Sequence, residues 1–104
     1  MRLAVVGGKL QGTEACYLGG KAGYETVLLD RRQGVPAAGL ASETHSLDVL
    51  LQPDAASDVL ATCDAVLPAC EEDNVLAWLD EQCRRREIPL LFDRRAYQVS
   101  SSKV

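Results

Sequence analysis

Short apolar runs alternate along this chain with longer segments of helical spacing. Leu3–Val6 is bounded by glycine, and Glu25–Leu29 ends at Asp30. Continuous apolar runs of this length are typical of strands that are buried on both faces of a parallel sheet. Further strands are predicted at Glu43–Leu47, Asp64–Leu67 and Pro89–Phe92. The pattern therefore predicts a parallel sheet of about five strands.

Helices are predicted between these strands. Thr13–Lys21 places Ala15, Leu18, Gly19 and Ala22 on one side, and such residues let a helix pack closely on a sheet. The remaining predicted helices are Pro53–Ala61, Glu71–Arg86 and Arg94–Val99, and the segment from Arg31 to Ser42 is a loop with room for one helical turn. Alternating strands and helices predict an α/β fold, a Rossmann-like sheet flanked by helices with right-handed crossovers.

The first strand runs directly into a glycine-rich turn, Gly7-Gly8-Lys9-Leu10-Gln11-Gly12. A strand, a glycine turn and a helix point free N–H groups and a helix N-terminus at one spot, which favours a phosphate or a carboxylate. Lys9 stands where the dinucleotide fingerprint G-x-G-x-x-G has its second glycine, and the turn also lacks the G-x-x-x-x-G-K-[ST] pattern. The turn thus predicts a site for a nucleotide or an anionic small molecule, while a plain tight connection stays an alternative.

Acidic residues follow three of the predicted strands. Asp30 follows the second, Asp48 comes shortly after the third, and Glu71 follows the fourth. Ligands of parallel sheets bind beyond the carboxyl ends of the strands, so we expect these acids to converge on the glycine turn. Asp30 stands 23 positions after Gly7, close to the spacing at which an acid meets a ribose hydroxyl. Each acid also fits a plainer role in a solvated loop, a turn or the first turn of a helix.

Composition narrows the function further. The chain has 104 residues and a formal charge of −4, which predicts one domain without the basic field that nucleic acid requires. No run approaches the roughly 18 apolar residues of a membrane span, and no signal-peptide pattern opens the chain. Cys16, Cys63, Cys70 and Cys83 form no C-x-x-C pair and His45 is the single histidine, so no metal site is predicted and reduced thiols in a cytoplasmic protein are expected. No catalytic set of side chains is evident.

Three strings carry a resemblance to a known family: Gly7-Gly8-Lys9-Leu10-Gln11-Gly12, Asp64-Ala65-Val66-Leu67-Pro68 followed by Glu71, and Leu91-Phe92-Asp93. With them the chain closely resembles the N-terminal, pre-ATP-grasp domain of the PylC family of pyrrolysine-biosynthesis ligases. The resemblance runs through essentially all 104 residues. It implies a carboxylate–amine ligase of the EC 6.3 type, which uses ATP and Mg²⁺ to join 3-methylornithine to the ε-amine of lysine through an acyl-phosphate.

The resemblance also implies a division of the protein. Residues 1–99 would form the pre-ATP-grasp domain, and residues 100–104 would lead toward an ATP-grasp domain in cis that binds Mg²⁺. The chain alone would then bind substrates without catalysing the reaction. ATP contacts of the family fall on Lys9, Asp30, Asp48, Val49 and Lys103, and contacts to the lysine substrate fall on Leu10, Gln11 and Glu71. No catalytic residue and no metal ligand of the family falls in this chain.

Two other classes of protein stay in view. One is a nicotinamide-dinucleotide-binding Rossmann module of an oxidoreductase, against which Lys9 argues. The other is a stand-alone regulatory or interaction module. For the ligase we expect amino-acid substrates as partners, with neither nucleic acid nor membrane, and a homodimer through an exposed edge of the α/β fold is left open.

Overall fold

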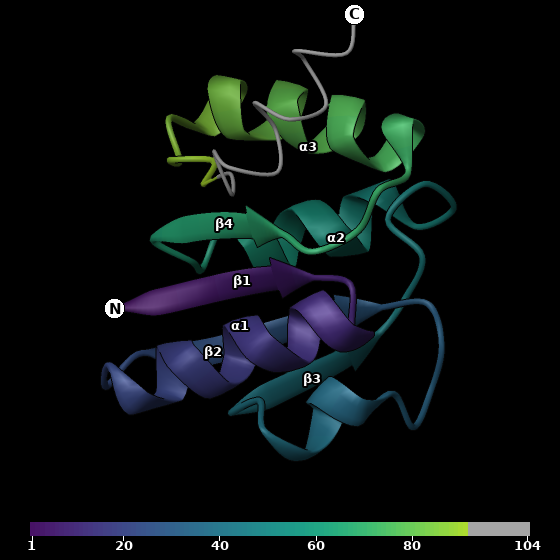
Figure 1. Ribbon diagram of the computed structural model, residues 1–104. Helices are drawn as coiled ribbons and strands as arrows, with labels where there is room; N and C mark the ends of the chain where they lie inside the picture. The colour runs from purple at the N-terminus through teal and green to yellow at the C-terminus, as the bar shows by residue number, and fades with distance from the viewer. Residues whose placement is uncertain (92–104) are drawn as a thin grey trace, which may run out of the picture.

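A single parallel sheet with helices on both faces forms the centre of the computed structural model, which describes residues 1–91 (Figure 1). The sheet has the strand order β3-β2-β1-β4. Its strands are β1 (Arg2–Val6), β2 (Glu25–Asp30), β3 (Glu43–Ser46) and β4 (Ala65–Pro68), and the helices are α1 (Leu10–Lys21), the 3-10 turn η1 (Pro36–Gly39), α2 (Pro53–Leu60) and α3 (Asp73–Arg86). The predicted α/β class and the parallel arrangement are confirmed.

The predicted number of strands is one too high for the described residues. In the predicted strand Pro89–Phe92, only an isolated parallel bridge forms, between Leu90 and Val66. The Leu91 N–H donates to the Val66 carbonyl at 2.7 Å, whereas Pro89 has no N–H to donate, so the ladder stays short. Phe92 and the predicted helix Arg94–Val99 lie outside the described residues.

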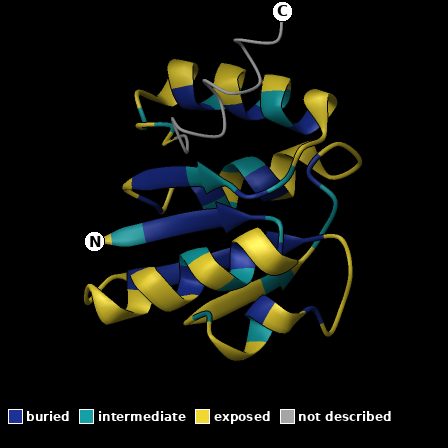
Figure 2. Ribbon diagram, viewed as in Figure 1, coloured by how far each residue is buried: buried dark blue, intermediate teal, exposed yellow. Residues whose placement is uncertain are grey.

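Two apolar layers cover the sheet, one on each face. The strands β1 and β2 between them consist mostly of buried residues (Figure 2). On one face Cys16 of α1 and Ala37 of η1 pack with Val5 and Leu28. On the other face the side chains of α2 and α3, including Leu60 and Leu79, pack with alternate residues of the same strands. Both central strands are therefore buried on both sides, as their continuous apolar runs predict.

Helix α1 differs from the prediction in its start and in its buried face. It begins at Leu10, three residues before the predicted start. Its buried residues are Gly12, Cys16 and Gly19, whereas Leu18 is 55% exposed. This face is buried because Gly12 and Gly19 pack closely. A Cβ at Gly19 would lie 2.9 Å from the Thr26 side chain, so α1 can approach the sheet only with its glycine face.

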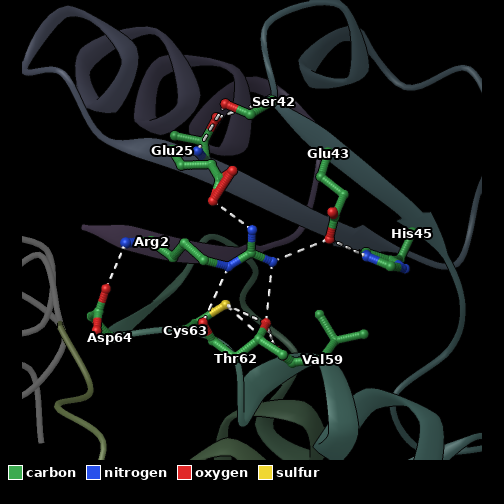
Figure 3. Close-up of polar contacts among 10 residues, drawn as sticks. Arg2, Glu25, Ser42, Glu43, His45, Val59, Thr62, Cys63 and Asp64 are labelled. Atoms are coloured by element: carbon green, nitrogen blue, oxygen red, sulfur yellow. Dashed lines mark hydrogen bonds and ion pairs between the residues drawn. The ribbon is translucent and has the colours of Figure 1, made fainter.

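At the amino edge of the sheet, Arg2 ties several segments together (Figure 3). Its guanidinium pairs with Glu25 at the start of β2 and with Glu43 at the start of β3, and it donates to the Thr62 carbonyl at 3.1 Å. The Arg2 N–H donates to the Asp64 carboxylate at 2.7 Å. Hydrogen bonding to Glu25 is the main cause that raises the pKa of Arg2. These contacts fix the strand starts, opposite the carboxyl edge where ligands of such sheets bind.

All four cysteines are free thiols, and Cys16, Cys63 and Cys83 are buried while Cys70 is half-buried. Among the described helices, none is long and apolar enough to cross a membrane.

Candidate functional site

The glycine turn at the carboxyl end of β1 is fixed by close backbone packing. Gly7 has a φ of +113°, and a Cβ there would lie 2.6 Å from the Ala69 carbonyl oxygen. A Cβ at Gly12 would lie 1.8 Å from the carbonyl oxygen of Gly7. Only glycine fits at both positions, because α1 begins directly against the turn. The sequence Gly7 to Gly12 thus sets where the helix N-terminus lies.

The N-terminus of α1 is open toward solvent. No side chain caps the helix, and its first turn holds no acidic residue. The first N–H groups of a helix lack partners inside the helix and carry a partial positive charge, which favours an anion. Lys9, Leu10 and Gln11 are all exposed beside it. The turn therefore offers a cation and backbone donors to an anionic group.

Asp30, the last residue of β2, is buried and holds the glycine turn. Its side chain is 3% exposed, and Oδ2 accepts a hydrogen bond of 2.6 Å from the Gly8 N–H. Arg32 supplies the other donors: its backbone N–H and Nε reach Oδ1 at 2.8 and 3.1 Å, and Nη2 reaches Oδ2 at 3.0 Å. Asp30 thereby joins the end of β2 to the turn after β1.

The charge state of Asp30 follows from these contacts. Burial by itself raises the pKa of a carboxyl group, and it is the largest single influence on Asp30. The hydrogen bonds from the Arg32 side chain and backbone and from Gly8 together outweigh it, so the pKa of Asp30 lies below its ordinary value. The carboxylate is therefore ionised at neutral pH.

Two adjoining cavities open at this edge of the sheet. The smaller, of about 60 Å³, is lined by Asp30, Asp48 and Val49 together with the ends of β1 and β2. The larger, of about 490 Å³, is lined by Lys9, Leu10, Gln11 and Glu71. Both share one wall, formed by Gly7, Arg31, Arg32, Cys70 and Glu72. The predicted convergence of the three acids on the glycine turn is confirmed.

The residues that the family resemblance assigns to ATP and those that it assigns to lysine lie largely in different cavities. Leu10, Gln11 and Glu71, assigned to the lysine substrate, lie together in the larger cavity. Lys9, assigned to ATP, lines the same larger cavity and not the smaller one. Lys103 lies outside the described residues.

Asp48 and Val49 take part in the structure of the smaller cavity. The Asp48 carboxylate accepts hydrogen bonds from the N–H groups of Leu50 and Leu51, at 2.9 and 3.3 Å. Val49 is 5% exposed and belongs to the apolar layer under α2 and α3. Asp48 is thus a turn residue, as one interpretation of the sequence expects, and it also lines the cavity.

The sequence patterns do not predict that arginines form part of the shared wall. Arg31 and Arg32 fall in a segment whose sequence predicts only a loop. Arg31 forms an ion pair of 3.7 Å with Glu72, which joins this loop to the start of α3. The available signal was a pair of arginines directly after an acid that ends a buried strand.

A metal ion finds no ready site in this part of the protein. Residues 1–91 contain no group of three His, Cys, Asp or Glu side chains arranged to hold one. Of the acids that line the cavities, Asp30 already accepts hydrogen bonds from Arg32 and Gly8, and Asp48 accepts from backbone donors.

Comparison with solved structures defines the class of the fold. The chain matches N5-carboxyaminoimidazole ribonucleotide synthetase from Thermotoga maritima with a TM-score of 0.71 and 18% identity, over 86% of this chain and 24% of that one. The synthetase from Staphylococcus aureus, solved with ADP, matches with a TM-score of 0.68 and 19% identity, over 86% and 23% of the two chains. The fold is that of the pre-ATP-grasp domains.

Sequence comparison narrows this class to particular relatives. The chain is 37% identical over 101 residues to the 3-methyl-D-ornithine–L-lysine ligase of Methanosarcina barkeri, and 34% identical to that of Methanosarcina acetivorans. Each match covers 97% of this chain and 28% of the relative. No protein-family model matches the sequence. The chain is a homologue of the N-terminal part of these PylC ligases, and the alternative of a nicotinamide-binding oxidoreductase module is not supported.

Proposed function

We propose that this chain forms the substrate- and nucleotide-binding N-terminal domain of an ATP-dependent ligase that joins 3-methyl-D-ornithine to the ε-amine of L-lysine. The observation that carries the proposal is the match of 97% of the chain to ligases of that name, at 37, 34 and 31% identity. The chain spans about 28% of the length of these relatives. An ATP-grasp domain in cis after about residue 99 would supply the remaining parts of the active site, including the Mg²⁺ ligands.

The larger cavity suits the amino-acid side of such a reaction. Its volume of about 490 Å³ lies within the range of small-molecule sites, roughly 300–1,000 Å³. The exposed carboxylate of Glu71 can hold a substrate ammonium, and the open N-terminus of α1 at Leu10 and Gln11 can hold a substrate carboxylate. We assign this cavity to lysine.

The smaller cavity, with Asp30, Asp48 and Val49, is assigned to the nucleotide, and Lys9 and Lys103 would add contacts to it. ATP, when bound, supplies the phosphoryl group that activates a carboxylate for attack by an amine. In this scheme the described residues bind and orient: Lys9 offers a cation to phosphate, and Val49 offers an apolar surface. Two of the solved structures with this fold contain ADP, which supports the use of a nucleotide.

Calorimetry of the 104-residue chain with three ligands tests the proposal. We expect weak binding of ATP, very weak binding of L-lysine and no binding of NAD, because half of the proposed site belongs to another domain. Clear binding of NAD without binding of ATP would contradict the ligase assignment.

A further inference from the structure

The wall between the two cavities narrows the side that is assigned to the nucleotide. The smaller cavity holds about 60 Å³, far less than the roughly 300 Å³ at which small-molecule sites begin. Arg31 and Glu72 cross the wall as an ion pair of 3.7 Å, and Arg32 lies beside them. Because the Asp30 side chain is only 3% exposed, a ribose can reach it only if part of the wall moves.

Asp30 identifies the part that has to move. A carboxylate offers about four acceptor positions. Four donors occupy them: the N–H groups of Gly8 and Arg32 at 2.6 and 2.8 Å, and Nε and Nη2 of Arg32 at 3.1 and 3.0 Å. A ligand hydroxyl can therefore reach Asp30 only by replacing a donor that is already present.

The Arg32 guanidinium is the replaceable donor. The other two donors are backbone groups, and Gly8 is held in a turn where an added Cβ would meet Val35 at 2.4 Å. The Arg32 side chain is 42% exposed, while the carboxylate that it covers is 3% exposed. Rotation of this long side chain uncovers Asp30 without any change in the backbone.

Building on the proposed function, we propose that Arg32 gates the nucleotide side of the site. Binding exchanges the Arg32 guanidinium on Asp30 for ribose hydroxyl groups of the nucleotide. Asp30 stands at the end of β2, where an acid in such sheets accepts from ribose hydroxyls. The released guanidinium still borders both cavities, and at their shared wall it can pair with the phosphates of the ligand.

Binding of adenosine and of 2′,3′-dideoxyadenosine to the full-length protein, measured by calorimetry, tests this exchange. Adenosine carries no phosphate, so losing the positive charge of Arg32 does not remove a phosphate contact. The dideoxy compound lacks the 2′- and 3′-hydroxyl groups that would replace Arg32 on Asp30. We expect Arg32→Met to bind adenosine about tenfold more tightly than the unmodified protein, because the competing charged hydrogen bonds are gone. The affinity for 2′,3′-dideoxyadenosine should be the same in both proteins.

Two further variants complete the test. Arg32→Lys keeps the charge but loses the planar guanidinium group, so its gain in affinity for adenosine should be smaller. If Arg32→Met does not fold, Arg32→Lys provides the same comparison. Arg85→Met, at the far end of α3, removes one exposed arginine and should leave both affinities unchanged.

Two results would overturn the gate. One is adenosine binding that Arg32→Met leaves unchanged or weakens, and the other is an equal gain for the dideoxy compound. Absence of adenosine and ATP binding in every variant would instead overturn the nucleotide assignment of the proposed function, and the gate with it.

Discussion

The backbone N–H of Gly8 lies 2.6 Å from Oδ2 of Asp30, and this contact joins the turn after β1 to the end of β2. Gly8 and Asp30 are 22 positions apart in the chain. The contact holds the glycine turn on the side of β2, while Gly12 of α1 packs against the Gly7 carbonyl on the other side of the turn. The positions of Lys9, Leu10 and Gln11 at the larger cavity therefore depend on a buried carboxylate that belongs to the neighbouring strand.

Replacing Asp30 by Asn tests how much this contact stabilises the fold. Asn keeps the shape but loses the charge, so the hydrogen bonds from Arg32 and Gly8 weaken. We expect a loss of about 2 kcal/mol in the free energy of unfolding, measured with urea, since hydrogen bonds to charged groups contribute roughly 1.5–3 kcal/mol. Asp58→Asn, on the exposed side of α2, should change little. Equal effects of the two substitutions would disprove a special role for Asp30.

The same contact predicts how stability depends on pH. The pKa of Asp30 is lower in the folded protein than its ordinary value of about 3.9 in an unfolded chain. Its contribution is therefore fully present above that value and is lost as the pH falls through the folded pKa. The difference in unfolding free energy between the unmodified protein and Asp30→Asn should stay constant from pH 7 to 5 and shrink below about pH 4. A difference that grows as the pH falls from 7 to 5 would mean that the folded pKa is raised instead.

Much of this fold and part of the site follow from local sequence patterns. The apolar runs before Gly7 and Asp30 predict the two central strands, and the shared carboxyl edge predicts that Asp30, Asp48 and Glu71 approach the glycine turn. The direction of the α1 face was not predictable from apolar spacing, because glycine packing overrides the hydrophobicity of Leu18. The role of Arg32 depends on its side chain folding back onto Asp30, and such a contact leaves no periodic signal in the sequence.

Glu71 provides a test of the lysine assignment. If its carboxylate holds the substrate ammonium, Glu71→Gln in the full-length protein should raise the KM for lysine, since an imperfectly paired ammonium costs roughly 1–3 kcal/mol, or about tenfold. The KM for ATP should stay unchanged. Glu81→Gln, at an exposed position on α3, serves as the matched control. A lysine KM that Glu71→Gln does not alter would remove Glu71 from the site.

Thiol labelling gives an independent view of the shared wall. Cys70 lines both cavities and is half-buried, whereas the other three cysteines are buried. Burial raises the pKa of the Cys70 thiol, so iodoacetamide should modify it slowly at neutral pH and faster as the pH rises. We expect Cys70 to react before the other thiols, lysine to slow the reaction, and Cys70→Ser to abolish the first phase, as followed by mass spectrometry. Earlier labelling of Cys16 or Cys83 would contradict the described packing.

The most direct test of the proposed function is the formation of ADP by the full-length protein in the presence of 3-methyl-D-ornithine and L-lysine. We expect ADP to form with ATP and Mg²⁺, sustained turnover to require both amino acids, and a conjugate of the two amino acids to appear in an amount equal to the ADP. ADP formation that is indifferent to lysine, or no conjugate at any concentration of the three substrates, would contradict it.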